Sequence, residues 1–431
     1  MKLWIRNGHV MDPSVDMEKD ADVLLCDGKV VAIGEDLSGN ASVEDADEII
    51  DAKGLAVMPG FIDLHVHFRE PGFEYKETVK TGALSAAAGG FTSVCPMPNT
   101  KPVMDDAEDV KNFLAICERD AIVHVLPVGA VTVGQEGKEL ADIKGMKEAG
   151  ICAISEDGKS VMDAALYEKA MEIAAEIKLP VFAHCEDKEI LNGGVMNAGA
   201  AAERFGHPGI TNEVEDSIIR RDIALAQKTG AKLHLCHCST KNSVEYVEEA
   251  KKKEIDVTAE VCPHHFTMTE DEILADDGNY KMNPPLRTRE DVDALADGLS
   301  RGIMDVISTD HAPHGREEKS LSIAKAPFGI VGLETSFCLG VTELVEKGKL
   351  SRMELVRKMS TNPAKVLGIE KGTIQVGSAA DLVIADFDEE WVIDREKFYS
   401  KGKNTPFHGK RVKGKVKYTI VDGKIVYREE N

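Results

Sequence analysis

Two histidines, His65 and His67, stand two residues apart directly after the apolar run 55–62. Side chains at positions i and i+2 of a strand face the same way. This spacing allows both imidazoles to bind one metal ion, with Asp63 behind them as a supporting carboxylate. A His-x-His pair alone is a weak motif, so its position after a buried strand is what makes it a candidate metal site.

The middle of the chain alternates short apolar runs with segments of helical length, such as 164–177 and 217–228. Those segments carry apolar and charged residues at helical spacing. A series of β-then-α units within about 300 residues favours a (β/α)₈ barrel over the competing doubly wound sheet. The expected strands are 57–62, 92–95, 122–127, 151–154, 181–183, 232–235, 256–260 and 305–308.

The two ends of the chain share a different pattern, in which turn residues separate short apolar runs. Asn7-Gly8 and Asp27-Gly28 near the start, and Asp422-Gly423 near the end, are typical of hairpin turns. We therefore expect an α/β protein in which a TIM-like barrel is joined to a small β-sandwich domain built from both ends. The expected boundaries are 58–366 for the barrel, and 1–57 and 367–431 for the two parts of the small domain.

Composition excludes several classes of function. The formal net charge is −23, from 75 acidic and 52 basic residues, and no long Lys/Arg run predicts a nucleic-acid or anionic-membrane surface. The nine cysteines are odd in number and scattered through apolar runs, which favours a reducing compartment over a disulfide framework. With neither a signal-peptide core nor a run of about 18 apolar residues, the sequence predicts a cytoplasmic protein.

Metal-ligand residue types follow five of the expected strands. In a (β/α)₈ barrel the active site lies at the carboxyl ends of the strands, so these side chains should converge. A lone histidine at a strand end is more often a hydrogen-bonded core residue, but a pattern shared by five strand ends favours metal binding. The candidate ligands are His65, His67, Asp157, His184, His237 and Asp310.

This donor set suits zinc-like ions, which bind imidazole nitrogen and carboxylate oxygen. A shared carboxylate and a bridging hydroxide hold two such ions about 3.5–4 Å apart, and the pair can hydrolyse an amide-like bond. Cys236-His237-Cys238 lacks a second Cys/His pair at zinc-finger spacing, so we expect the two thiols to pack at a strand end. Gly158-Lys159-Ser160 is no phosphate loop, because position 153 is Ala where that motif needs Gly.

Five longer motifs then point to a family: PGFIDLHVHFR at 59–69, PMPNT at 96–100, MNPPLR at 282–287, TDHAPH at 309–314 and FGIVGLET at 328–335. Together they resemble the amidohydrolase superfamily and, within it, the bacterial type I dihydroorotases. The resemblance covers essentially the whole chain. It implies reversible hydrolysis of the cyclic amide of L-dihydroorotate to N-carbamoyl-L-aspartate, a step of de novo pyrimidine (UMP) synthesis.

The same resemblance implies a role for each candidate residue. Two Zn²⁺ ions per subunit are expected, with Asp157 and a hydroxide bridging them and Asp310 serving also as general base and acid. The first ion would be held by His65, His67 and Asp310, and the second by His184 and His237. Arg69, Asn99 and His314 would bind the substrate carboxylate, and Asn283, Phe328 and Gly329 its ring.

Two alternatives remain open at this point. A dihydropyrimidinase, hydantoinase or allantoinase shares the chemistry, and such relatives commonly bridge their metals with a carbamylated lysine, for which Lys159 is the nearest candidate to Asp157. Arg69 argues for a substrate that bears a carboxylate, because allantoinase-like sequences typically carry Asn there. A non-catalytic scaffold is the second alternative, although every ligand position is filled.

The expected partner is a small-molecule substrate, and the resemblance leaves a homodimer and a complex with aspartate transcarbamoylase open. The polar segment 315–319 lies just beyond the last ligand. It is expected either to close over the substrate or to form a solvated connection.

Overall fold

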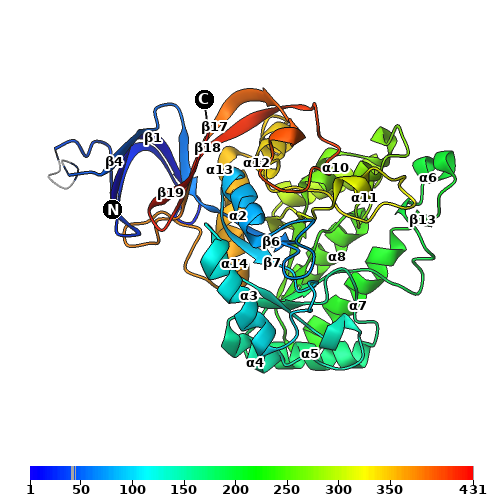
Figure 1. Cartoon of the computed structure of the whole chain (residues 1–431). Helices are drawn as coiled ribbons and strands as arrows, with labels where there is room; N and C mark the ends of the chain where they lie inside the picture. Colours follow the sequence, from blue (N-terminus) through cyan, green and yellow to red (C-terminus); the bar gives the residue numbers. More distant parts are fainter. Residues whose placement is uncertain (40–42, 44, 431) are drawn as a thin grey trace.

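Short parallel strands alternate with helices around the larger part of the molecule, and strands from both chain ends form a separate sheet beside it (Figure 1). The computed structural model describes residues 1–39, 43 and 45–430. The fold is a TIM-like (β/α)₈ barrel with a small β-sandwich domain, as expected from the sequence. Among the described residues, no helix combines the length and the apolar character needed to cross a bilayer.

The barrel wall closes through backbone hydrogen bonds. Its strands are β6 (Phe61–Val66), β7 (Phe91–Pro96), β8 (His124–Val125), β9 (Val128–Ala130), β10 (Ala153–Ser155), β11 (Val181–Ala183), β14 (Leu233–Leu235), β15 (Val257–Val261) and β16 (Val306–Ile307). β6 pairs with β7 and β7 with β8. The second parallel run consists, in chain order, of β9, β10, β11, β14, β15 and β16. The amide of His67 donates to the carbonyl of His311 at 2.8 Å and joins the first strand to the segment after the last.

The longer helices lie outside the strands. They are α2 (Val79–Ala88), α3 (Ala107–Asp120), α4 (Ile143–Ala149), α5 (Ala164–Glu176), α7 (Glu213–Thr229), α8 (Lys241–Lys252) and α10 (Arg289–Ser300). Shorter segments are α6 (Ala200–Phe205), α9 (Pro263–Thr267), α11 (Arg316–Lys319), α12 (Ser336–Gly340), α13 (Arg352–Val356), α14 (Asn362–Leu367), and the strands β12 (Met196–Asn197) and β13 (Gly209–Ile210). Helix α3 shows why these helices form where they do. Asp106 caps its first amides, and Val110, Phe113 and Cys117 bury one face against the barrel.

The β-sandwich sheet has the strand order β19-β18-β17-β5-β1-β2-β3, with β4 also paired to β1. Its core consists of aliphatic side chains contributed by both chain ends, such as Leu3, Ile5, Leu382 and Ile420. In Figure 1 the N-terminal strands and the C-terminal strand β19 lie at the same end of the molecule, where they belong to one sheet. The strands are β1 (Lys2–Asp12), β2 (Met17–Cys26), β3 (Lys29–Gly34), β4 (Glu48–Asp51), β5 (Ala56–Pro59), β17 (Leu382–Val392), β18 (Arg411–Val421) and β19 (Lys424–Arg428).

Two local expectations were wrong. The run 57–62 is not one strand: it divides at Gly60 into β5, which pairs with β1 and β17, and β6, which begins the barrel. A Cβ on Gly60 would lie 2.3 Å from the side chain of Thr92, so the crossing between the two sheets requires glycine. Asn7-Gly8 is not a hairpin turn but an irregularity inside β1, where Asn7 has a positive φ of 56°.

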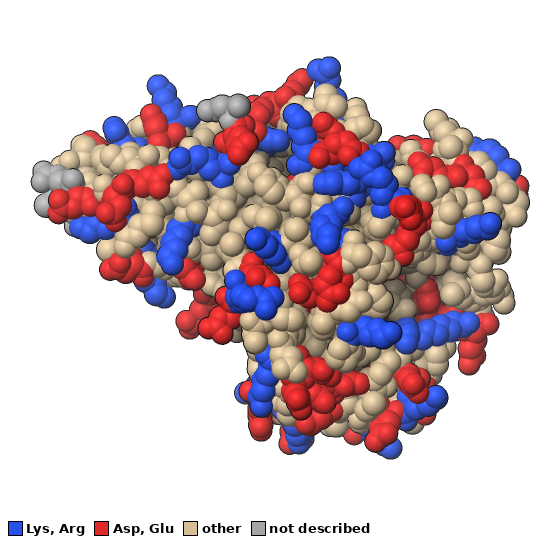
Figure 2. All heavy atoms as spheres, viewed as in Figure 1, with Lys and Arg blue, Asp and Glu red and all other residues tan. Residues whose placement is uncertain are grey.

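The other expectations for strands and turns agree better with the structure. Each of six further runs overlaps an observed strand. Only β8 falls inside the expected strand 122–127, and β9 begins just after it at Val128. Asp27-Gly28 and Asp422-Gly423 do form the turns between β2 and β3 and between β18 and β19. On the face seen in Figure 2, acidic and basic side chains are interspersed and form no extended basic patch.

Candidate metal centre and substrate cavity

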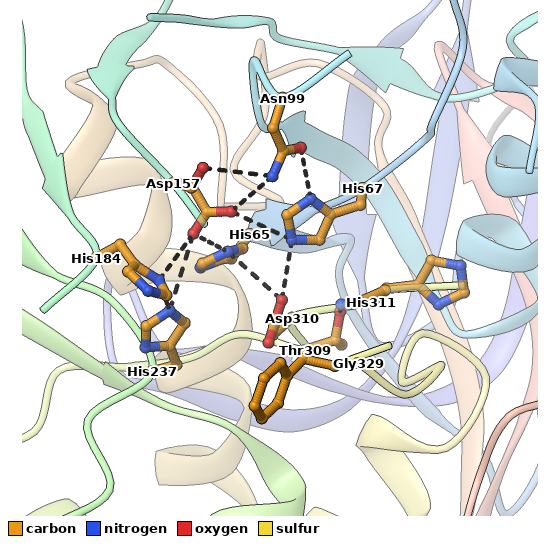
Figure 3. Close-up of polar contacts among 12 residues, drawn as sticks. His65, His67, Asn99, Asp157, His184, His237, Thr309, Asp310, His311 and Gly329 are labelled. Atoms are coloured by element: carbon orange, nitrogen blue, oxygen red, sulfur yellow. Dashed lines mark hydrogen bonds and ion pairs between the residues drawn. The ribbon is translucent and has the colours of Figure 1, made fainter. Parts of the chain in front are cut away.

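The six candidate ligands meet at the carboxyl ends of the barrel strands, and all six are buried. His65 lies within β6 rather than after it, and His67 follows it by two residues on the same side, as Figure 3 shows. The others stand one or more residues after β10, β11, β14 and β16. The close-up therefore contains His65, His67, Asp157, His184, His237 and Asp310 in one cluster.

Asp157 is the centre of this cluster. Its Oδ1 lies 3.1 Å from His65 Nε2, 3.4 Å from His184 Nδ1 and 3.8 Å from His237 Nε2. Its Oδ2 lies 3.5 Å from His67 Nε2. One carboxylate thus faces all four imidazoles, which is the arrangement that a shared ligand between two metal ions requires.

Asp310 approaches the cluster from the opposite side. Its Oδ1 is 3.1 Å from His67 Nε2 and 3.5 Å from His65 Nε2. Burial disfavours the charged carboxylate, but the imidazoles of His65 and His67 outweigh burial and bring the pKa of Asp310 to about 2. Both Asp310 and His237 have positive φ values, 48° and 34°, so the backbone is strained where it turns these side chains inward.

The residues fit a metal cofactor. His65 Nε2 and His184 Nε2 are buried and have no hydrogen-bond partner among the described residues. Ring nitrogens of His184 and His237 stand 2.8 Å apart, beside the same oxygen of Asp157. The ligand atoms of His65, His67 and Asp310 lie within 4.8 Å of one another, as do those of His65, Asp157 and His237. Convergent imidazole nitrogens and carboxylate oxygens without other partners are the donors of a metal site.

A carboxylate that the sequence did not single out supports the ligands from behind. Glu260, at the inner side of β15, is fully buried, and its Oε1 lies 2.9 Å from His65 Nδ1. The same oxygen accepts the backbone N–H of His237 at 3.1 Å, and Oε2 lies 3.0 Å from His234 Nε2. Burial opposes ionisation, but His234 and His65 hold the pKa of Glu260 well below its ordinary value. Glu260 was hard to identify from the sequence, because it lies inside an expected strand and not among the residues that follow one.

Asn99 bridges two of the ligands. Its Nδ2 donates to Asp157 Oδ2 at 3.1 Å, and its Oδ1 lies 3.0 Å from His67 Nδ1. Lys159, the alternative bridging group, donates instead to the carbonyl of Gln135 at 2.8 Å. In this structure the carboxylate of Asp157 occupies the place between the imidazoles.

A cavity of about 320 Å³ opens above the ligands. Most of the expected substrate-binding residues line it, and Glu186, which the sequence did not single out, lines it too. Glu186 accepts a hydrogen bond from the side-chain amide of Asn283. The lining includes Arg69, Asn99, Asn283, Phe328 and Gly329 together with His67, Asp157, His184, His237 and Asp310.

His314 is the expected substrate ligand that stands farther back, outside that lining. Its Nε2 donates to the carbonyl of Phe328 at 2.7 Å, and its Nδ1 lies 3.1 Å from Lys76 Nζ. Burial and the charges of Arg69 and Lys76 hold the pKa of His314 far below its ordinary value. His314 is therefore neutral, and it acts on the cavity wall through Phe328.

Arg69 brings a positive charge to the cavity. Its Nε donates to the carbonyl of Pro313 at 3.2 Å, and one terminal nitrogen lies 3.4 Å from His314 Nε2. No carboxylate of the described residues lies within 4.0 Å of the guanidinium. A guanidinium beside a cavity that has unused N–H donors, and no carboxylate partner among the described residues, is suited to bind an anionic ligand.

Comparison with known proteins agrees with this geometry. A family model described as dihydro-orotase-like matches residues 54–243, and one for the amidohydrolase family matches residues 161–427. The dihydroorotase of Caldanaerobacter subterraneus subsp. tengcongensis is 47% identical, covering 100% of this chain and 98% of that protein. The dihydroorotase of Staphylococcus epidermidis is 45% identical, covering 100% of both.

Solved structures support the fold. L-hydantoinase (dihydropyrimidinase) from Arthrobacter aurescens has a TM-score of 0.89 at 28% identity, covering 100% of this chain and 96% of that one. Dihydropyrimidinase from Brevibacillus agri has a TM-score of 0.86 at 29% identity, covering 99% and 95%. These proteins resemble the chain in architecture, whereas the two full-length sequence relatives named above are dihydroorotases. The chain therefore belongs to the dihydroorotase family of the amidohydrolase superfamily.

Proposed function

We propose that this metal-dependent cyclic amidohydrolase hydrolyses L-dihydroorotate to N-carbamoyl-L-aspartate, catalyses the reverse ring closure, and serves de novo pyrimidine (UMP) synthesis. The observation that carries the proposal is the guanidinium of Arg69, which stands without a carboxylate partner in the cavity that also contains the candidate metal ligands. Dihydroorotate offers both groups that such a cavity recognises: a ring amide to be cleaved and a carboxylate to pair with the cation.

The donor set supports two Zn²⁺ ions. His65, His67 and Asp310 would hold one ion, His184 and His237 the other, with Asp157 shared between them. When bound, zinc supplies Lewis acidity for the amide carbonyl and makes a hydroxide nucleophile available near neutral pH.

We assign the proton transfers to Asp310. Its ionised carboxylate faces the ligand cluster and lines the cavity, so it can accept a proton from the attacking oxygen nucleophile. The same oxygen then returns that proton to the ring nitrogen as the amide bond breaks. In the reverse direction Asp310 takes the proton from the ureido nitrogen as that nitrogen attacks the side-chain carboxyl carbon, and it returns the proton to the carboxyl oxygen that leaves.

Substrate orientation is assigned to the cavity wall. Arg69 would pair with the carboxylate, with Asn99 beside it, and His314 would hold the wall behind them through its bond to Phe328. Asn283 and the cavity wall at Phe328 and Gly329 would contact the ring.

The decisive experiment compares dihydroorotate, dihydrouracil, hydantoin and allantoin with the same purified enzyme, together with metal analysis. We expect turnover of dihydroorotate in both directions and a measurable but much lower kcat/KM for the three uncharged rings. A chelator should abolish the activity, and added zinc should restore it. Preferential turnover of dihydrouracil or hydantoin would identify a dihydropyrimidinase instead. A protein that binds no metal and turns over none of the four would be a scaffold. A cytoplasmic location, a homodimer and a complex with aspartate transcarbamoylase stay predictions.

A further inference from the structure

A buried lysine stands behind the cavity wall. Lys319 ends α11 in the segment 315–319, and only 2% of it is exposed. Its Nζ donates to three backbone carbonyls, those of Lys281 at 3.0 Å, Pro327 at 3.0 Å and Gly329 at 2.8 Å. Among the described residues, no carboxylate lies within 4.0 Å of this nitrogen. The cation is therefore solvated by backbone dipoles rather than by an opposite charge.

Such a group is costly to bury, because an ammonium loses its hydration and here gains no ion pair. Burial has the largest effect and the charge of Lys281 the next largest, and they lower the pKa of Lys319 to about 7. A lysine in this position does not contribute to stability as a salt bridge would. The role of Lys319 must therefore come from the backbone groups that it binds.

What Lys319 holds is the backbone of residues 327–329, where Phe328 and Gly329 line the substrate cavity. All three carbonyls of this segment accept hydrogen bonds from side chains that do not line the cavity. Lys319 Nζ donates to the carbonyls of Pro327 and Gly329, and His314 Nε2 donates to the carbonyl of Phe328. Asn404 Nδ2 donates to the carbonyl of Gly329 as well, at 3.0 Å.

The local backbone is already restricted. Gly329 has a φ of 126°, and a Cβ there would lie 2.6 Å from that of Ala312, so only glycine fits. The amide of Gly329 donates at 3.0 Å to the carbonyl of Lys281, the same oxygen that Lys319 binds. The Nζ of Lys281 itself lies 4.4 Å from the centre of the Phe328 ring. Lys319 thus joins the two backbone segments that form this wall.

We propose that Lys319 is a positioning residue that turns the carbonyl dipoles of residues 327–329 away from the cavity, so that the Phe328–Gly329 wall accepts an anionic ring substrate. A carbonyl oxygen that faced the cavity would repel the carboxylate and the ring carbonyls of the ligand. This inference rests on the proposed function, because it concerns how that site selects an anion. Lys319 also ties the end of segment 315–319 to this wall, which favours a fixed connection over a loop that closes on the substrate.

The test uses the metal-loaded enzyme and three variants. Lys319→Met keeps length and volume but removes the cation and its donors, Lys319→Arg keeps a cation with different geometry, and Lys325→Met changes an exposed lysine of the same loop. Two quantities are measured: KM and kcat for dihydroorotate and dihydrouracil, and amide hydrogen exchange of residues 326–331 without substrate.

We expect Lys319→Met to raise KM for dihydroorotate at least tenfold, with kcat within about threefold of the parent and a much smaller change for dihydrouracil. Exchange of the 326–331 amides should become at least tenfold faster. Lys319→Arg should recover part of both losses, and Lys325→Met should change neither. If Lys319→Met does not fold, Lys319→Arg carries the test in milder form, because its altered geometry should shift the same KM ratio in the same direction.

Unchanged exchange and an unchanged KM ratio in a folded Lys319→Met enzyme would overturn the proposal. Equal rises in KM for the two substrates would also overturn it, since they would indicate a general structural role. A parent enzyme with no dihydroorotate turnover would defeat the proposed function instead. The exchange measurement, made without substrate, would still decide whether Lys319 holds the wall.

Discussion

Glu260 Oε1 lies 2.9 Å from His65 Nδ1 and also accepts the backbone N–H of His237 at 3.1 Å. One buried carboxylate therefore orients a candidate ligand of each proposed metal ion. A carboxylate that accepts the N–H of a metal-binding imidazole fixes the tautomer, so that the other ring nitrogen presents its lone pair to the metal. The arrangement predicts that metal affinity depends on a residue that touches no metal.

Glu260→Gln tests this dependence. The amide keeps the shape but removes the negative charge behind His65, so we expect zinc affinity to fall about 10- to 100-fold. Competition with a chromophoric chelator measures the affinity directly, without an activity assay. Glu249→Gln on the exposed side of α8 is the matched control and should bind zinc as the parent does. An affinity equal to that of the parent would remove the assigned role of Glu260.

Asp310→Asn separates proton transfer from metal binding. The amide preserves the shape of the side chain and one oxygen donor but cannot accept the proton. We expect the variant to fold, to keep much of its metal, and to lose on the order of 10²- to 10⁴-fold in kcat in both directions. Rates of hydrolysis and of ring closure are measured beside the metal content. Turnover close to that of the parent would exclude Asp310 as the general base.

Arg69→Ala examines the source of substrate selectivity. Removing the guanidinium should raise KM for dihydroorotate at least about tenfold and affect an uncharged cyclic imide much less. Arg69→Lys should be intermediate, because an ammonium lacks the planar fork that matches a carboxylate. Arg119→Ala, on the exposed side of α3, serves as the control. Equal effects on both substrates would contradict the pairing of Arg69 with a carboxylate.

The partly buried Glu334 predicts a pH dependence of stability. Burial raises its pKa from 4.5 to about 7, although it accepts the amides of Tyr399 and Ser400. A carboxyl whose pKa is higher in the folded state favours folding while protonated, and it loses that contribution as pH rises from 4.5 through 7. The loss amounts to about 2–3 kcal/mol.

Glu334→Gln should abolish this loss. Relative to the parent, the variant should gain about 2–3 kcal/mol in free energy of unfolding between pH 5 and pH 8. Urea unfolding at several pH values measures the difference, and the exposed Glu317→Gln should show no such trend. A difference between Glu334→Gln and the parent that stays constant with pH would mean that Glu334 is ionised throughout.

The ligand cluster was predictable because its signal is local. Each ligand follows or ends an apolar run, and the barrel geometry brings the carboxyl ends of such runs together. His65 and His67 were found by their spacing together with their place at the end of an apolar run, and Asp157 by its place after the fourth run. Arg69 followed from the family resemblance, and the structure places it in the cavity.

The residues that were not predicted contact partners that lie far from them in the sequence. Glu260 meets His65 across 195 positions, and Lys319 meets Lys281 across 38. Nothing in the neighbouring sequence indicates that either charge is buried. The division at Gly60 was missed for a related reason. The run 57–62 is apolar on both sides of Gly60, so only the packing of Gly60 against Thr92 reveals that the chain passes there from one sheet to the other.

The sheet that joins both ends of the chain has a consequence for how the protein is made. Strand β5 pairs with β17, so strands synthesised first find these partners only after more than 300 further residues have been added. Until then, the edge of β5 that β17 will cover stays open on the nascent chain. Such distant pairings fold slowly and expose strand edges to other chains. We therefore expect newly made protein to depend on chaperones until its last strands emerge, and C-terminal truncations to aggregate rather than to leave a free barrel.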